Sequence, residues 1–408
     1  MQESEQVDIY DVVIVGGGPA GATAATDLAG KGLSVMLLER GGRIKPCGGA
    51  IPPIAIDEFN IPDSQIVARV KSARVVSPTQ RHVDMPIDGG YVGMVDRKDF
   101  DEWLRQRAAV AGAQRETGTF MKLSRDDDDI AVVHFRRGRN RKELERVRAR
   151  TVIGADGARS EVARQSIPEA KTIPYVAAYH EIIHSPESMA ATGESAKEPH
   201  FDSKRCDIYY EGRLSPDFYA WVFPHGDTTS VGVGSAHKGF SLRSAVATLR
   251  DEAGLGGNHT VRREGAPIPL RPLSKWDNGK DVVLAGDAAG VVAPASGEGI
   301  YYAMLGGRLA AESVADCLAT GNVKELSRAR KRFMKAHGRV FWILGIMQKF
   351  WYSNDKRRER FVSMCGDPDV QHLTWQAYMY KRLVRAKPLA HVRIFFKDLA
   401  HLFGFVAP

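Results

Sequence analysis

The stretch Asp11-Val12-Val13-Ile14-Val15-Gly16-Gly17-Gly18-Pro19-Ala20-Gly21 decides the fold of this chain. Residues 11–15 form a short, mostly apolar and β-branched run, which is typical of a strand covered on both faces of a parallel sheet. The glycines lead into an alanine-rich helix that we expect to reach Leu28, and a second strand, Ser34–Leu38, ends at Glu39. The sequence therefore predicts a complete β-α-β unit.

The glycines of this turn have the G-x-G-x-x-G spacing. Gly16 permits the tight turn, Gly18 lets a pyrophosphate approach the backbone, and Gly21 brings helix and strand together. The N-terminus of the helix offers free N–H groups and a partial positive charge to phosphates. Glu39 is placed to accept hydrogen bonds from ribose hydroxyls. We expect an adenine dinucleotide, either NAD or FAD; the alternative is a glycine-rich turn without a ligand.

Two later segments favour a flavin. Residues 151–160 and 281–290 each read as a strand that runs into a turn and a helix. In the second of them, Asp287 would bind a polyol such as the ribityl chain of a flavin. Residues 296–300 open a helix that continues to Cys317, and its free N–H groups would face the flavin pyrimidine carbonyl and stabilise the reduced ring.

Composition excludes several other classes of protein. The chain has 408 residues, 43% of them apolar, which suits two to four packed domains and rules out a disordered or fibrous chain. The cysteines are scattered, without C-x-x-C or zinc-ligand spacing, so we expect no metal site, no disulfide scaffold and a reducing cytoplasm. The acidic N-terminus does not resemble a signal peptide. Apolar runs such as 341–347 are too short to span a bilayer.

Positive charge is concentrated at the C-terminal end. The net charge of the chain is +8, and residues 325–408 carry 17 Lys and Arg against 6 Asp and Glu. Basic clusters alternate there with apolar groups at 341–344, 350–352 and 394–396. This pattern suits peripheral contact with an anionic membrane; the alternative is a helical region with a solvated basic face. No nucleic-acid-binding motif accompanies the charge, so we expect no nucleic acid partner.

Several motifs together resemble a known family. They are the G-x-G-x-x-G with its acid, the G-A-D-G-A-R-S segment at 154–160, the late G-D pair at 286–287, Pro46-Cys47-Gly48-Gly49, Gly93-Met94-Val95-Asp96-Arg97, Pro216-x-x-Tyr219-x-Trp221-x-Phe223-Pro224 and Ser296-Gly297-Glu298-Gly299-Ile300-Tyr301-Tyr302. In this order they resemble the FAD-dependent group that includes aromatic hydroxylases and geranylgeranyl reductases. They are most similar to the geranylgeranyl reductase family of chlorophyll and bacteriochlorophyll synthesis, from about Asp8 to the C-terminus.

The resemblance implies an α/β (α+β) fold with a discontinuous Rossmann-type FAD domain. We assign this domain to residues 1–75, 93–173 and 272–325. An antiparallel-sheet substrate domain would take residues 76–92 and 174–271, where alternating patterns favour strands. Residues 326–408 would form the helical, basic and apolar C-terminal region. The acidic run 126–129 and the basic stretch 136–150, around a strand-like 131–135, predict a solvated hairpin.

The motifs and the resemblance together give a set of cofactor-binding residues. They are Gly16, Gly18, Pro19, Ala20, Gly21, Glu39, Arg40, Cys47, Gly48, Gly49, Arg97, Asp156, Gly286, Asp287, Gly297, Gly299 and Ile300. No second complete G-x-G-x-x-G is present, so a nicotinamide donor would bind transiently. The family implies NADPH as the donor, with reduced ferredoxin as the alternative, and the sequence does not choose between them.

The implied reaction is reduction of isolated C=C bonds of a geranylgeranyl chain to a phytyl group, on the diphosphate or on a pigment ester. Cys47, Tyr219 and Trp221 are the predicted catalytic residues. Cys47 lies in a loop whose glycines would let it approach the flavin, unless it only fills space. Tyr219 and Trp221 alternate on one strand and either line an isoprenoid tunnel or belong to the core. His180, His184 and His225 form no recognisable triad, and we expect core or surface roles for them.

The same motifs are compatible with three alternative functions. An archaeal-type digeranylgeranylglycerophospholipid reductase would use the same chemistry on lipids. An aromatic-ring monooxygenase would need oxygen, and a pigment-tail carrier would perform no chemistry. An insoluble isoprenoid substrate resides in lipid, so we expect a cytoplasmic protein associated peripherally with the photosynthetic membrane, and contact with pigment-synthesis enzymes fits that place.

Overall fold

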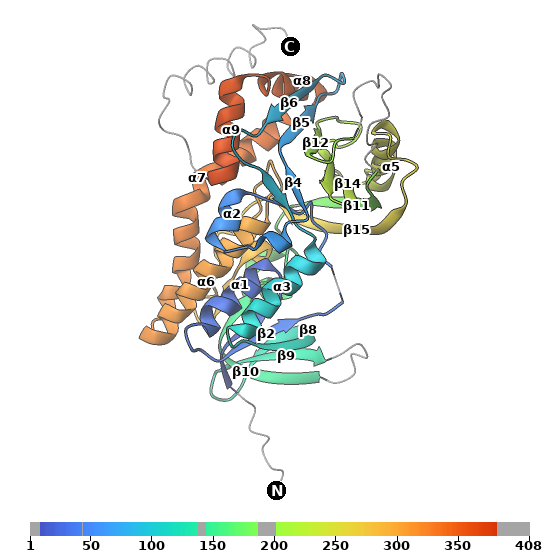
Figure 1. Ribbon diagram of the computed structural model, residues 1–408. Coiled ribbons are helices and arrows are strands. Elements are labelled where there is room, and N and C mark those ends of the chain that lie inside the picture. Colours follow the sequence, from blue (N-terminus) through green and yellow to red (C-terminus); the bar gives the residue numbers. More distant parts are fainter. Residues whose placement is uncertain (1–8, 43, 138–143, 187–200, 382–408) are drawn as a thin grey trace. The chain divides into compact units, whose positions relative to one another are not determined.

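The structure is a computed structural model that describes residues 9–42, 44–137, 144–186 and 201–381 (Figure 1). The chain folds as two compact units. The first is formed by the described parts of Met1–Lys45, Arg97–Tyr175 and Pro267–Gly345, and the second by those of Pro46–Asp96, Val176–Ala266 and Ile346–Pro408.

The first unit is built on a six-stranded sheet. Its strands are β1 (Ile9–Val15), β2 (Val35–Glu39), β8 (Gln114–Arg125), β9 (Ala131–Arg137), β10 (Leu144–Gly154) and β16 (Val282–Leu284). Parallel pairing gives the order β8-β2-β1-β10-β16, with β9 antiparallel to both β8 and β10. Residues Val12 to Val15 are almost completely buried, which agrees with the continuous apolar run of a central parallel strand.

Helices cover this sheet. They are α1 (Pro19–Ala29), α3 (Arg97–Val110), α4 (Glu161–Ser166), α6 (Ile300–Thr320) and the first part of α7 (Arg328–Trp351), with 3₁₀ turns η2 (Pro168–Lys171), η3 (Gly286–Ala289) and η4 (Val323–Ser327). Helix α1 packs against both α3 and α6 (Figure 1). A Cβ at Gly307 of α6 would overlap the Ala20 carbonyl oxygen, so a glycine is needed for the two helices to touch.

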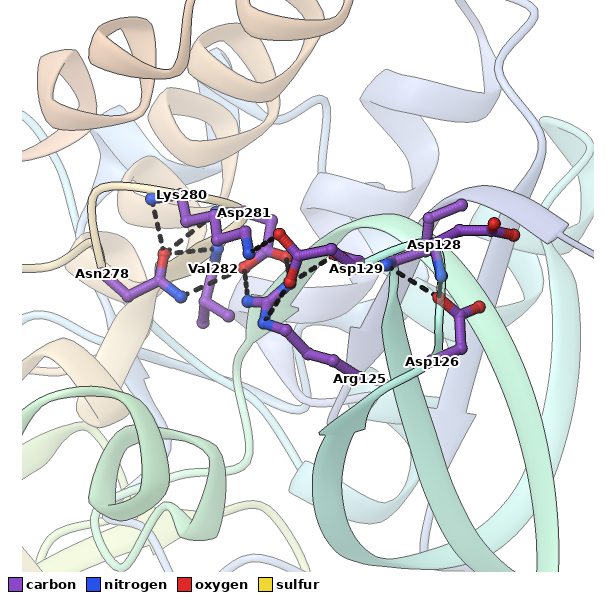
Figure 2. A network of polar contacts seen from close by, with 9 residues as sticks. Arg125, Asp126, Asp128, Asp129, Asn278, Lys280, Asp281 and Val282 are labelled. Carbon is purple, nitrogen blue, oxygen red and sulfur yellow. Dashed lines mark hydrogen bonds and ion pairs between the residues drawn. The ribbon is translucent and has the colours of Figure 1, made fainter.

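The acidic run at 126–129 forms the turn of the β8–β9 hairpin, and three of its four carboxylates form ion pairs, among them that of Asp129 (Figure 2). Asp126 and Asp128 bind Arg148, and Asp129 binds Lys280. Arg125 holds Asp281 through two hydrogen bonds of 2.6 and 2.8 Å. The hairpin is thereby fastened to the residue that precedes β16.

The second unit contains a seven-stranded and a three-stranded sheet. The larger has the order β15 (Thr260–Pro269), β11 (Tyr175–His184), β14 (Thr228–Ser235), β13 (Ala220–His225), β12 (Arg205–Tyr209), β5 (Ser72–Val76) and β6 (His82–Pro86). The smaller has the order β3 (Ala50–Ile51), β7 (Val92–Met94) and β4 (Ala68–Val70). The large sheet is antiparallel as expected, except that β5 and β12 run parallel.

Helices of the second unit pack on these sheets. They are α2 (Pro53–Glu58), α5 (Leu242–Glu252), α8 (Asp355–Met364) and α9 (Pro368–Tyr380), together with the end of α7 and the 3₁₀ turn η1 (Asp63–Gln65). Val246 and Leu249 of α5 lie in one apolar cluster with Val231 and Val233 of β14. Such burial of aliphatic side chains stabilises each by about 1.5–3 kcal/mol.

The division into units differs from the predicted domains at several limits. Residues 46–75 and 93–96 belong to the second unit, because β3 and β4 pair with β7, and β5 pairs with β6 and β12. The C-terminal region does not stand apart: 326–345 belong to the first unit and the described part of 346–408 to the second. Within the described residues, no helix is long and apolar enough to cross a membrane.

Candidate functional site

The turn between β1 and α1 is shaped by glycines. Gly16 has φ of 107°, and a Cβ there would overlap the Ala155 carbonyl oxygen at the end of β10. A Cβ at Gly21 would overlap the carbonyl oxygen of Gly16 itself. Glycine at these two positions removes the side chains that would clash, so α1 can begin close to the end of β1, as the spacing predicts.

Gly18 differs from its neighbours because a Cβ there would meet nothing within 4 Å. It is the N-cap residue of α1, and no side chain caps the helix, which starts with Pro19. The first amides of an uncapped helix need an outside acceptor. Open space in front of unpaired amides is the arrangement that a pyrophosphate requires.

Glu39 lies at the end of β2 and accepts a hydrogen bond from the Gly17 amide. Its carboxylate borders a cavity of about 130 Å³ lined by Leu37, Glu39, Gly41, Gly42, Glu102, Arg105, Arg115, Glu116 and Thr117. Arg105 of α3 also donates to the Gly17 carbonyl oxygen at 3.3 Å. The predicted ribose-binding acid therefore sits at the mouth of a polar cavity beside the glycine turn. Neither Arg105 nor the cavity had a sequence signal.

A second group of predicted residues lies at the start of η3 and α6. Gly286 has φ of 63°, and a Cβ there would lie 2.8 Å from that of Ala20 in α1. Asp287 forms an ion pair with Lys45, a residue outside the predicted cofactor-binding set. Gly299 is the uncapped N-cap of α6, and a Cβ on it would lie 3.8 Å from Asp287 Oδ1.

The starts of α1, η3 and α6 therefore lie together in the first unit. Gly297, with φ of 66°, and Ile300, the first residue of α6, flank Gly299 in this group.

Other predicted cofactor residues are held by protein partners. Arg97 begins α3 and is buried, with a two-pronged ion pair to Asp101 at 2.7 and 2.8 Å. Asp156 accepts hydrogen bonds from Ser160 and from the first amides of α4. Removal of its carboxyl from water raises the pKa of Asp156, and those hydrogen bonds oppose the rise. Arg40 is exposed.

Cys47, Gly48 and Gly49 belong to the second unit. The Gly49 amide lies 3.4 Å from Cys47 Sγ, and the Val95 amide donates to the Gly49 carbonyl oxygen at 2.9 Å. Cys47 is partly exposed, whereas Cys206, Cys317 and Cys365 are buried. Burial raises the pKa of the Cys365 thiol to about 12.

Trp221 lies in β13, whereas Tyr219, predicted on the same strand, immediately precedes it; their ring centres are 5.9 Å apart. Both side chains are buried. Burial raises the pKa of the Tyr219 phenol, and the nearby Tyr352 phenol adds to the rise. The structure therefore places the three predicted catalytic residues in the second unit.

The Trp221 indole is held by a polar network absent from the sequence prediction. Its Nε1 donates to Ser230 Oγ at 3.1 Å, and that hydroxyl lies 2.9 Å from His180 Nδ1. The Nε2 atom of His180 lies 3.0 Å from the Glu264 carboxylate. His180 thus has the core role expected of it. His184 is exposed.

These features fit an adenine dinucleotide in the first unit. They are the open space at Gly18, the uncapped N-termini of α1 and α6, and the polar cavity at Glu39. Phosphate, ribose and a reducible ring need such amide donors and carboxylate acceptors.

Comparison with known proteins gives several relatives along nearly the whole chain. The geranylgeranyl diphosphate reductase of Rhodobacter capsulatus is 55% identical over 98% of this chain and 99% of its own. That of Synechocystis is 36% identical over 97% and 98%. The digeranylgeranylglycerophospholipid reductase of Methanocaldococcus jannaschii is 31% identical over 81% and 83%.

Other matches concern the fold or part of the chain. A family model described as lycopene cyclase protein matches residues 11–184. A geranylgeranyl bacteriochlorophyll reductase-like structure from Thermoplasma acidophilum aligns with a TM-score of 0.79 at 23% identity, over 94% of this chain and 99% of that one. A flavin-dependent brominase aligns with a TM-score of 0.70 at 18% identity, over 96% and 99%. These structures share the flavoprotein fold.

Proposed function

Because this chain belongs to the geranylgeranyl diphosphate reductase family, we propose that it is an FAD-dependent reductase that converts a geranylgeranyl chain to a phytyl group. The single observation that carries this is the identity of 55% along essentially the whole length of one such reductase. The open glycine turn and uncapped helix ends of the first unit supply a matching cofactor site.

In the first unit we assign the pyrophosphate of FAD to the amides at the start of α1 and the adenosine ribose to Glu39. The α6 N-terminus, with Gly297, Gly299 and Ile300, would stabilise negative charge on the flavin. Asp287 is the acid for the ribityl chain, with Lys45 as its ion-pair partner in the structure.

Bound FAD supplies a hydride. A C=C bond that is not conjugated to a carbonyl cannot pass charge to an oxygen, so a proton must be added to the neighbouring carbon. The chain must therefore bind the isoprenoid in a fixed orientation and provide the proton.

We propose that Tyr219, Trp221 and Cys47 form the substrate-binding part of the second unit. Tyr219 keeps its proton because burial raises its pKa. The Trp221 N–H is engaged with Ser230, so its ring offers an apolar wall. Cys47 is partly exposed on the loop that leads to β3.

NADPH is the proposed electron donor, by the resemblance to the family, and reduced ferredoxin is the alternative. Among the relatives, the archaeal lipid reductase gives the second candidate function, at 31% identity. The higher identity and coverage of the diphosphate reductases favour the phytyl-forming reaction.

We propose peripheral contact with a photosynthetic membrane, where an oily substrate or pigment-synthesis enzymes would reside. Several of the aromatic side chains considered for this contact belong to the core: Phe341, Trp351 and Tyr352 are buried, and 394–396 lie outside the described residues. On α7, however, Trp342 is 68% exposed and Ile346, one turn later, is 47% exposed. Arg339 precedes them on the same side, which suits an anionic bilayer.

The test is anaerobic incubation of the purified, FAD-loaded protein with NADPH and either geranylgeranyl diphosphate or geranylgeranyl-bacteriochlorophyll. Each reduced double bond adds a pair of hydrogen atoms, so mass analysis of the product reports the reaction. Turnover without oxygen excludes a monooxygenase, and any change in product mass excludes a carrier. A protein that stays colourless after FAD is added back contradicts the proposal.

A parallel incubation with an archaeal-type digeranylgeranylglycerol phospholipid compares the two reductase functions. Faster reduction of the phospholipid than of either pigment-type substrate would favour the second candidate.

A further inference from the structure

The far end of β13 covers the Cys47 loop. Phe223 and His225 alternate along the strand and point to the same side. A Cβ at Gly48 would lie 3.1 Å from Phe223 Cδ2, and one at Gly49 would lie 2.5 Å from His225 Nε2. Two successive glycines are thus matched by two alternate side chains of the strand.

His225 is tied to both the strand and the loop. Its Nδ1 lies 3.0 Å from the Phe223 carbonyl oxygen, and the ring also hydrogen-bonds the backbone of Gly48. On the other side of Gly49, the Val95 amide donates to its carbonyl oxygen at 2.9 Å. A Cβ at Gly49 would also lie 2.6 Å from the Val95 oxygen, so Gly49 is enclosed between β7 and His225.

This enclosure sets the conformation of the loop around Cys47. Gly49 has φ of 70°, and its amide points at Cys47 Sγ at a distance of 3.4 Å. A shift of the Gly48–Gly49 backbone would therefore move the thiol. Burial lowers the pKa of His225 to about 4, so the ring is neutral near pH 7 and holds the loop by packing and hydrogen bonds.

We propose that His225 is a positioning residue of the reductase, which fixes the Cys47–Gly49 loop and so the place of the Cys47 thiol. The consequence for turnover rests on the proposed function, whereas the effect on the loop does not. The sequence offered one sign of it: His225 continues the alternation of Tyr219, Trp221 and Phe223.

The test compares His225→Asn with His225→Gln in the FAD-loaded full chain. Asparagine replaces the Nδ1 side of the ring only, whereas the longer glutamine reaches the position of Nε2 beside the loop. His237→Asn is the matched control, because His237 is an exposed histidine of the same unit. Amide hydrogen exchange, read by mass spectrometry, covers peptides 46–51, 92–97 and 242–252.

In His225→Asn we expect exchange in 46–51 and 92–97 to rise about fivefold, since one net hydrogen bond is lost from the locally opened state. Exchange in α5, at 242–252, stays unchanged, and His225→Gln and His237→Asn resemble the native protein. Unchanged exchange in 46–51 for His225→Asn would overturn the proposal. So would an equal rise in α5, which would show only general destabilisation, or a loop as loose in His225→Gln as in His225→Asn.

A turnover measurement then separates this proposal from the proposed function. If the native protein reduces geranylgeranyl diphosphate, we expect kcat of His225→Asn to fall at least fivefold with KM changed less than twofold, and His225→Gln to recover most of it. An unchanged kcat despite a loosened loop would refute the link between the loop and turnover. Absence of turnover in the native protein would instead refute the proposed function and leave the exchange result intact.

Discussion

Gly18 faces open space, although Gly16 and Gly21 in the same turn are enclosed by backbone atoms. Its φ of −77° and ψ of −174° are open to any residue. Gly18→Ala should therefore keep the Tm of the apoprotein within about 2 °C, since alanine in place of glycine at one N-cap costs no more than about 1 kcal/mol, a small shift in a chain of this size. The added methyl group occupies the space assigned to the pyrophosphate, so the Kd for FAD should rise at least about tenfold, as measured by flavin fluorescence.

Gly21→Ala is the contrasting substitution. Its Cβ would overlap the Gly16 carbonyl oxygen, so helix and strand must separate even without a ligand. The apoprotein itself should lose about 3 kcal/mol or more of stability in urea unfolding. If Gly18→Ala destabilised the apoprotein as much as Gly21→Ala, the open space at Gly18 would have no ligand role.

His225 should make stability depend on pH. Its pKa is lowered from 6.5 to about 4 by burial, in spite of the hydrogen bonds to the Phe223 and Gly48 backbone and the charge of Asp96; nearby His180 acts in the same direction as burial. The unfolded chain binds a proton more readily than the folded one, so stability rises with pH between 4 and 6.5 and is lost as pH falls through that window.

At the acid end of this pH window, protonation linked to His225 should lower the free energy of unfolding by up to about 3 kcal/mol. Urea unfolding at several pH values measures it, with His225→Phe compared with the native chain. The pH slope of the native protein should exceed that of the variant in this window. Equal slopes would mean that the His225 proton does not distinguish the folded from the unfolded state.

At the scale of elements, the two-pronged contact of Arg125 with Asp281 joins the β8–β9 hairpin to the start of β16 (Figure 2). The hydrogen bond from Arg125 to Asp281 is the main cause that raises the pKa of the Arg125 guanidinium. A double-mutant cycle with Arg125→Met and Asp281→Asn should give a coupling of about 1–2 kcal/mol, because the pair is bidentate and partly buried.

The exposed pair of Arg148 and Asp128 in the same hairpin is the matched control. Asp128 is 74% exposed at its side chain, so its coupling with Arg148 should stay below about 0.5 kcal/mol. Equal coupling energies in the two cycles would mean that the Arg125–Asp281 contact stabilises the protein no more than a surface ion pair does.

Elements with a strong local pattern could be predicted from the sequence. The strand of 11–15 is β1, the helix to Leu28 is α1 to within a residue, and the helix after Gly299 is α6. Contacts between distant segments could not be predicted from the sequence. Two examples are the ion pair of Lys45 with Asp287 and the packing of His225 against Gly49. These residue types occur in many environments, and their spacing in the sequence follows no helix or strand periodicity.

At the scale of the whole molecule, the predicted domain limits depended on motif positions, whereas the units depend on strand pairing. The register of Ser72 beside Arg205 places β5 in the sheet of the second unit, and no local pattern encodes such a partner. The same holds for α7, whose first part packs with the first unit: Phe341 lies 4.9 Å from Tyr302, ring centre to ring centre.

This packing changes how membrane contact must be tested. Deletion from Phe341 onward would remove Phe341 and Tyr352 from the core, so loss of binding would show nothing about a docking surface. Single substitutions on the exposed side of α7 avoid this. Trp342→Ser removes a ring that is 68% exposed, and Arg339→Glu reverses a charge one turn earlier.

Sedimentation with phosphatidylglycerol vesicles should show at least about tenfold weaker binding for either variant. Insertion of the Trp342 ring into the bilayer buries apolar surface worth about 1.5 kcal/mol or more, and Arg339→Glu changes the charge by two at about 1 kcal/mol each. Val110→Ser, on an exposed apolar residue of α3, is the control and should bind like the native protein. Phosphatidylcholine vesicles should bind all of them weakly, because the attraction is to the anionic headgroup. Native-level sedimentation of Trp342→Ser and Arg339→Glu would exclude α7 as the docking surface.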